Sequence, residues 1–287
     1  MGIPFAIYAI IFCYVPLFGW IMAFQNYKPK DGLWHSKFVG LLKFKRLFGD
    51  DVFLKTIRNT FCMGAMNLVF GTVCAIAFAI LLNEFWTVKG KKVVQTISYL
   101  PHFLSWIIVT GICFDVLSMD NGIINEVLVG LHIIKEPVIW LAHPKYFWWI
   151  VTFSNLWKET GWNSIIYLAA ITSINPDLYE AASIDGAGRL SKIWHITLPG
   201  LKPTIMILLI MNIGNVLNAG FEVQYLLGNG LVQSVSQTID IYVLKFGISN
   251  GDYSLGTAAG IFKSVVSIAL IAIANFGAKA AGEESLF

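Results

Sequence analysis

The sequence predicts an all-α integral membrane protein with six transmembrane helices. Of its 287 residues, 56% are hydrophobic and 13% are charged, whereas soluble domains are about 45–50% apolar and about 25% charged. A transmembrane helix needs about 20 mainly apolar residues, because the hydrocarbon core is roughly 30 Å thick and a helix rises about 1.5 Å per residue. Helices satisfy their own backbone hydrogen bonds in lipid, so we expect a helical bundle. Six segments have the required length: 3–24, 56–82, 93–117, 147–171, 203–221 and 255–276.

The first segment, 3–24, resembles a signal peptide only in its position. It lacks a basic n-region and a small-residue cleavage site, and its apolar stretch is as long as a span, so we expect a retained helix. A basic loop, 27–55, follows the first segment, and an amphipathic loop, 118–146, follows the third. The sequence shows no Gly/Ser-rich linker, low-complexity tract or internal repeat. We therefore predict one membrane domain over residues 1–287.

Composition and motifs argue against several classes of function. The formal net charge of +3 gives no case for nucleic-acid binding. A GxxxxGK[ST] phosphate-binding run is absent, so the chain is not a P-loop ATPase by itself, and we expect it to bind no cofactor. Neither a disulfide framework nor a metal site is expected from the cysteines, which fall inside predicted spans without ligand-like spacing. These are Cys13, Cys62, Cys74 and Cys113.

A polar stretch, EAASIDGAGRLSKIWHITLP, lies between the fourth and fifth apolar segments, at residues 180–199. Just before it, Asn175 can cap a helix, Pro176 suits the first helical position and Asp177 favours the positive helix end. A helix should therefore begin at Pro176. Gly186 tolerates positive φ, which allows this helix to end in a turn before a second one starts.

Proline should end the second helix in turn, because Pro199 and Pro203 lack a backbone donor. The sequence thus predicts two short helices outside the bilayer, joined by a tight turn, within a loop over residues 173–202. The alternative is an ordinary well-capped loop, since Pro, Gly and Asp are common turn residues.

The spacing within this loop resembles the EAA motif of permease subunits of ATP-binding-cassette importers. Glu180, Ala181 and Ala182 are followed after three residues by Gly186, and after nine more by ITLP at 196–199. Other stretches are similar to the sugar-permease (MalF-type) branch, and more narrowly to its LplB-like members. These stretches, which extend the likeness over most of the chain, are YVPLFGWIMAFQNY, FVGLLKFKRLF, RNT, GWNSIIYLAAI and GFEVQYLL.

This resemblance implies the type I importer permease fold, with the two short helices on the cytoplasmic side. They would act as a coupling element that sits in a groove of a separate ATP-binding subunit. Glu180 would contact that subunit, Ala181 and Ala182 would permit close approach, and Gly186 would set the turn. The full coupling set would be Glu180, Ala181, Ala182, Asp185, Gly186, Ile196, Leu198 and Pro199.

The resemblance also implies a function and a set of partners. The chain would be the membrane-spanning subunit of an importer for oligosaccharides, acidic polysaccharide fragments among them, in a bacterial inner (plasma) membrane. It would not be an enzyme, because ATP and Mg²⁺ would bind to two separate ATP-binding subunits that drive alternating access. A second, related permease subunit would complete the membrane part, and an extracellular solute-binding protein would deliver the sugar.

Polar residues inside the spans are candidates for a transport path, because lipid penalises them. In the fifth segment Asn212, Asn215 and Asn218 recur at three-residue steps and are expected to share one helical face. The alternative role is hydrogen bonding between helices, worth roughly 0.6–2 kcal/mol per bond, and the sequence favours neither role. The candidate set is Asn155, Lys158, Glu159, Asn163, Asn212, Asn215, Asn218, Glu222 and Lys263.

Lys263 could bind an acidic sugar, but pairing with Glu159 or Glu222 is the favoured interpretation. Trp157, Trp162 and Tyr225 could stack on sugar rings, although such residues more often mark a membrane interface. His102, at the start of the third segment, is expected at the cytoplasmic interface.

The distribution of positive charge and the EAA-like motif predict opposite orientations of the chain in the membrane. If the motif loop is cytoplasmic, the basic loop 27–55 lies outside, against the positive-inside rule. We give the motif more weight and expect a basic segment before residue 1.

Two other classes of function are alternatives. A secondary transporter or channel for a small polar solute should show duplicated halves or interrupted helices. An intramembrane enzyme should show a nucleophile with a base, or metal ligands, at workable spacing. Neither pattern is clear in the sequence.

Overall fold

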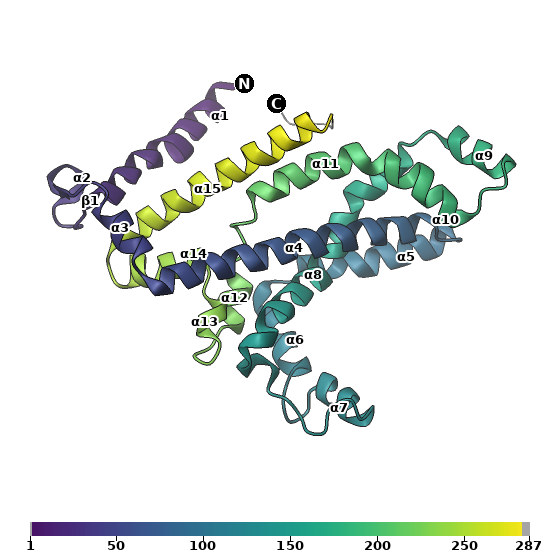
Figure 1. Ribbon diagram of the computed structural model, residues 1–287, viewed down its shortest axis with the longest axis horizontal. Coiled ribbons are helices and arrows are strands. Elements are labelled where there is room, and N and C mark those ends of the chain that lie inside the picture. The colour runs from purple at the N-terminus through teal and green to yellow at the C-terminus, as the bar shows by residue number, and fades with distance from the viewer. Residues whose placement is uncertain (1, 283–287) are drawn as a thin grey trace.

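The computed structural model describes residues 2–282, whose regular secondary structure is helical apart from one short β hairpin (Figure 1). Residue 1 and residues 283–287 of the predicted domain lie outside the described residues. Within the described part, four helices are long and apolar enough to cross a membrane, and a bent pair of helices makes a fifth candidate if it forms one span. The four are Gly2–Phe24, Asp51–Asn83, Arg189–Gly214 and Tyr253–Ala280. The predicted helical membrane architecture is therefore present, with four or five candidate spans.

The first candidate span changes its winding along its length. α1 (Gly2–Ala9) continues through a π-helical turn, Ile10–Tyr14, into a 3-10 segment, Val15–Phe24, with Pro16 near the start of that segment. The 3-10 segment packs against α15. The loop that follows contains an antiparallel hairpin and two short helices: β1 (Gln25–Asn26), α2 (Gly32–His35), β2 (Lys37–Phe38) and α3 (Leu42–Phe48).

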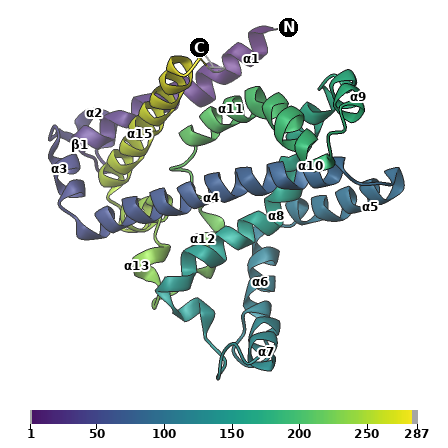
Figure 2. The same cartoon turned by 45° about the vertical axis from the view of Figure 1, so that its right-hand side comes forward.

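Two long helices, α4 (Asp51–Asn83) and α8 (Pro144–Thr172), cross at the centre of the molecule and pack on each other (Figure 2). Asp50 caps the start of α4, and its Oδ1 accepts a hydrogen bond from the Val52 amide at 2.9 Å. α8 also packs against α5, and this contact depends on Gly161, where an added Cβ would lie 2.1 Å from the Ser98 carbonyl oxygen. Close helix packing at small residues is typical of membrane bundles.

The third predicted segment, 93–117, is not one straight helix. α5 (Val88–Tyr99) runs into a 3-10 turn, Leu100–Phe103, and α6 (Trp106–Val116) then leaves at an angle of 102°. Pro101 removes a backbone donor, and Ser105 caps the new helix by accepting from the Ile108 amide at 3.4 Å. The loop after α6 contains α7 (Ile123–Gly130) and a 3-10 turn, Trp140–Ala142.

The predicted second coupling helix is not separate from the fifth span. After α9 (Pro176–Ile184), three segments continue without a break as one helix, Arg189–Gly214. Its parts are α10 (Arg189–Lys192), a π-helical turn (Ile193–Thr197) and α11 (Leu198–Gly214). The expectation that Pro199 and Pro203 end the helix was wrong. Pro199 occupies an early position in α11, and the π turn bonds the Leu198 amide to the Ile193 carbonyl just before it.

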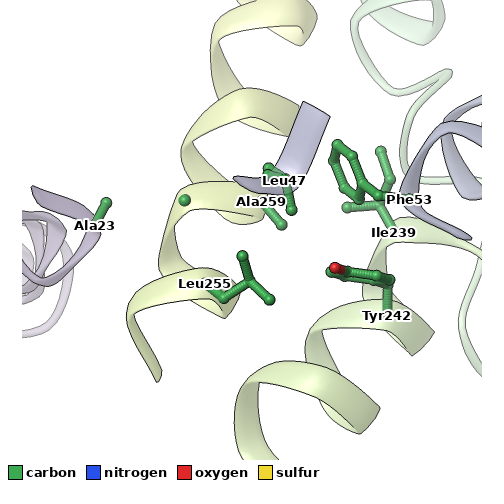
Figure 3. Close-up of a cluster of buried hydrophobic side chains, with 8 residues drawn as sticks. Ala23, Leu47, Phe53, Ile239, Tyr242, Leu255 and Ala259 are labelled. Carbon is green, nitrogen blue, oxygen red and sulfur yellow. The ribbon is translucent and has the colours of Figure 1, made fainter. Parts of the chain in front are cut away.

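The C-terminal part of the chain packs against the first candidate span. It comprises α12 (Glu222–Leu227), α13 (Gln233–Ser236), α14 (Ile239–Tyr242), a π-helical segment (Val243–Ser249) and α15 (Tyr253–Ala280). A buried apolar cluster joins the first span, α3, α4, α14 and α15 (Figure 3). Beside it, Tyr242 donates to Asp50 Oδ2 at 2.8 Å. Burial, followed by this hydrogen bond, raises the pKa of the Tyr242 hydroxyl well above its usual range.

Part of the positive charge of the basic loop is paired with α15. Asp252 caps that helix by accepting from the Leu255 amide at 3.1 Å. Its carboxylate also lies 2.8 Å from Lys43 Nζ and 3.4 Å from Arg46 Nη1. The Lys43 side chain is 9% exposed, so this ion pair is largely shielded from solvent. Two of the charges that conflict with the positive-inside rule are therefore bound within the fold.

Candidate functional site

The helix α9 lies at one end of the molecule, opposite the hairpin and α3 (Figure 1). Asn175 Oδ1 accepts from the Asp177 amide at 3.0 Å, and Pro176 is the first helical residue, as predicted. The helix ends at Gly186, which has φ +79°, and the Ala187 amide bonds the Ala182 carbonyl at 2.8 Å across the turn. This is the glycine-terminated helix end that the sequence indicates.

Much of the surface of α9 is exposed and is not covered by the rest of the described chain. None of its residues is buried, and Glu180, Ala181, Asp185 and Gly186 are exposed. Large apolar side chains beside them are exposed too, with Ile184 at 88% and Trp194 at 66%. A surface of this kind is typical of a protein contact. Ile196 and Leu198 are half-buried in the following helix, whereas Pro199 is exposed.

Two side-chain contacts that the sequence analysis missed hold α9 to the following helix. Tyr179 Oη lies 3.0 Å from Thr197 Oγ1, and Lys192 Nζ donates to Ser183 Oγ at 2.6 Å. The EAA pattern includes the position of Thr197 but gives no sign of its partner. Because α9 buries little surface, these two bonds are the polar link between its exposed face and the membrane helix.

The second part of the candidate site is a central cavity of about 770 Å³ between α4, α8 and α11. Its walls bring together seven of the nine polar residues predicted for a transport path. These are Asn155, Glu159, Asn163, Asn212, Asn215, Asn218 and Glu222. Asn67 of α4 also lines the cavity, and its buried Oδ1 has no hydrogen-bond partner within the described residues. No pattern in α4 singled out this asparagine, because it is an isolated polar residue in an apolar run.

Three asparagines of this cavity, Asn155, Asn215 and Asn218, bond within their own segments. Asn155 Nδ2 donates to the Val151 carbonyl at 2.9 Å, one turn back along α8. Asn218 Nδ2 donates to Asn215 Oδ1 at 3.0 Å. Such bonds do not link one helix to another. The geometry therefore favours the role of these asparagines as a cavity lining over a role in hydrogen bonding between spans. The predicted common helical face was wrong in detail, because α11 ends at Gly214 and Asn218 lies beyond the turn that follows it.

A charged network borders the cavity at the bend of the third segment. Lys158 is buried, and its Nζ donates to the His102 carbonyl at 2.6 Å and to Glu159 Oε1 at 3.1 Å. Glu159 Oε2 lies 2.7 Å from His102 Nδ1. The His102 ring stacks on Trp162 with centroids 4.4 Å apart. His102 is therefore held by α8, and Trp162 already has a stacking partner.

Lys263 lies outside the cavity. Its Nζ is 2.7 Å from Asp240 Oδ1 and 2.8 Å from Oδ2, so its partner is neither Glu159 nor Glu222. The prediction of an ion pair was right in kind and wrong in partner. Within residues 2–282, no group of three His, Cys, Asp or Glu side chains could hold a metal ion.

Comparison with known proteins gives matches along most of the chain. The family described as "Binding-protein-dependent transport system inner membrane component" matches residues 67–281. The "Polygalacturonan/rhamnogalacturonan transport system permease protein YteP" of Bacillus subtilis (strain 168) is 44% identical over 287 residues, which are 100% of this chain and 89% of that protein. "Protein LplB" of the same organism is 42% identical over 285 residues, 99% of this chain and 89% of that protein.

A solved structure has the same fold. The crystal structure of "bacterial alginate ABC transporter in complex with alginate pentasaccharide-bound periplasmic protein" contains a chain that superposes with a TM-score of 0.90 at 37% identity. The superposition covers 99% of this chain and 94% of that chain.

Proposed function

Because the chain belongs to the inner-membrane components of binding-protein-dependent transport systems, the permeases of ATP-binding-cassette importers, we propose that it carries an acidic oligosaccharide through its polar cavity. The predicted family is confirmed: the chain is a multi-pass inner-membrane permease of the carbohydrate-uptake branch, similar to YteP and LplB. As a permease subunit it is not itself catalytic.

The central cavity is the observation that carries this proposal. Amide and carboxylate groups line it, and such groups can donate to and accept from sugar hydroxyls. The substrate class is supported by two similar proteins, one named for polygalacturonan and rhamnogalacturonan transport and one solved as an alginate transporter. Both names refer to uronate-containing chains. We therefore assign to this chain a uronate oligosaccharide as substrate.

Six spans are proposed for the membrane part, with α8 and the bent α5–α6 pair added to the four apolar helices. α8 has 29 residues, which at about 1.5 Å per residue is roughly 43 Å, enough to cross the hydrocarbon core. Its polar residues line the cavity instead of facing lipid, so its lower hydropathy agrees with a spanning role.

The coupling role is proposed for α9. Its exposed surface would sit in a groove of an ATP-binding subunit on the cytoplasmic side, where ATP and Mg²⁺ would bind to that subunit. Two such subunits and a second, related permease would complete the importer, and a solute-binding protein would deliver the sugar from outside. Closure of the ATP-binding subunits would then displace α9, and its bonds to the following helix would pass that motion to α11.

The proposal is tested by purifying the tagged chain with its native partners and reconstituting the complex in proteoliposomes. Import of oligogalacturonate or oligoalginate, stimulated by ATP and by the solute-binding protein, is the expected result. A complex that lacks an ATP-binding subunit and transports without ATP would refute the proposal and favour a secondary transporter.

A further inference from the structure

Three cavities follow one another through the molecule and share walls. The central cavity and a middle cavity of about 440 Å³ share Trp106, Phe221 and Glu222. Tyr225 lines the middle cavity and also an outer cavity of about 430 Å³. The cavities are therefore neighbours in series, and a molecule in the middle one is adjacent to both of the others.

The outer cavity lies on the part of the molecule away from α9. Its wall is formed by α12, α13 and residues up to Lys245, and α12 and α13 lie far from α9 in both views (Figures 1 and 2). The π-helical segment that carries Lys245 leads to Asp252, which pairs with Lys43 at the end occupied by α3. If α9 is cytoplasmic, the outer cavity is the one that an arriving substrate meets first.

Lys245 differs from three lysines that form ion pairs within the described residues. The amines of Lys43, Lys158 and Lys263 lie 2.8, 3.1 and 2.7 Å from a carboxylate oxygen. Lys245 is half-buried and lines the outer cavity, and within residues 2–282 no carboxylate pairs with it. A partly buried charge without a partner is unfavourable, so this amine is suited to an anionic ligand.

Tyr225 supplies a second feature of a saccharide site. Its ring stacks on Phe221 with centroids 5.1 Å apart and planes inclined by 17°, and the side chain is 48% exposed. Packing on one face fixes the ring, while the exposed portion can contact a sugar through the apolar ring and the hydroxyl. The position of Tyr225 between two cavities places this contact between successive units of a chain.

We propose that the outer cavity is the entry subsite for one uronate unit, with its carboxylate paired to Lys245 and its ring against Tyr225. The neighbouring units of the same chain then extend past Glu222 toward the central cavity. This inference rests on the proposed function and adds to it the residue that selects an acidic substrate.

The test compares import of oligogalacturonate with import of its carboxyl-reduced form of the same length, using the reconstituted complex. Lys245→Gln should raise the apparent KM for oligogalacturonate about tenfold, the effect of losing one charge-assisted hydrogen bond, and leave the KM for the reduced form unchanged. Lys245→Arg keeps the charge and should retain the preference. Lys135→Gln is the matched control, since Lys135 is exposed on a loop and lines none of the three cavities.

The possible outcomes distinguish a failure of the proposed function from a failure of the entry subsite. If the wild type imports neither compound, the proposed function fails. If the wild type prefers oligogalacturonate and Lys245→Gln, folded as judged by its melting curve, keeps that preference, the proposed function stands and the entry subsite is refuted. An equal rise in KM for both compounds also refutes it, because the effect would not depend on the carboxylate.

Discussion

Tyr179 Oη and Thr197 Oγ1 lie 3.0 Å apart and connect the exposed helix α9 to the long helix that contains α11. Thr197 is 2% exposed, so one end of this bond is fixed in the bundle while the other moves with α9. The bond is thus placed to transmit force between the proposed docking surface on α9 and the cavity wall.

Loss of the Tyr179 hydroxyl should weaken this connection. A typical hydrogen bond contributes about 1 kcal/mol, so we expect Tyr179→Phe to reduce sugar imported per ATP hydrolysed about two- to fivefold. Thr197→Val should give a similar loss, whereas Thr197→Ser retains a hydroxyl and serves as control. The ratio is measured in proteoliposomes. If all three variants match the wild type, the bond does not transmit the motion.

Whether a substitution at Gly186 is tolerated should depend on how readily the new residue adopts a positive φ. Its φ of +79° is strained for most residues by about 1–2 kcal/mol, yet an added Cβ would meet no atom within 4 Å. Gly186→Asn, which visits this conformation readily, should keep most transport. Gly186→Leu should uncouple ATP hydrolysis from transport, because it strains the turn and adds bulk to the docking surface. Wild-type transport by Gly186→Leu that reaches the membrane would contradict the coupling role.

Gly64 permits the closest approach between α4 and the turn after α11. An alanine Cβ there would lie 1.9 Å from the Val216 carbonyl oxygen, and backbone cannot move aside cheaply. We expect Gly64→Ala to destabilise the protein by about 2–3 kcal/mol, seen as a lower Tm in detergent. Gly71→Ala is the control, since Gly71 lies on the same helix and cavity and has open space around it. A pair of equal Tm values would disprove the contact.

The buried amine of Lys158 should stabilise the protein through the two hydrogen bonds that it donates. Lys158→Met leaves Glu159 Oε1 and the His102 carbonyl without the donor they share, which should cost about 1–3 kcal/mol of stability. Adding Glu159→Gln removes the carboxylate charge that Lys158 faced and should recover part of the loss, giving a coupling energy in a double-mutant cycle. Melting curves of the three variants measure it. Strict additivity would show that the two side chains do not interact.

Local chemistry made α9 and the cavity lining predictable. Asn175 and Pro176 act within a few residues of one another, so their effect on the helix start does not depend on distant contacts. The polar residues Asn155 and Asn212 could be identified as a set because few positions in a lipid-facing helix accept an amide.

Features that depend on distant contacts were not predictable in the same way. The bend after α5 occurs inside an apolar run, and only the cap at Ser105 marks where α6 begins. The partner of Lys263 was misassigned because Asp240 lies in the short helix α14, outside the predicted spans, and the position of α14 relative to α15 is set by packing. Lys245 shows no sequence signal, since what distinguishes it is its place in the lining of the outer cavity, which only the folded structure reveals.

The ion pair between Lys43 and Asp252 joins residues that are 209 positions apart. At a synthesis rate of roughly 5–20 residues per second, Asp252 leaves the ribosome about 10–40 s after Lys43. During that interval the basic loop has no Asp252 to neutralise it, while the earlier helices are already inserting. This ion pair can therefore form only once the start of the last helix has been made, so it cannot hold the first helices in place while they insert.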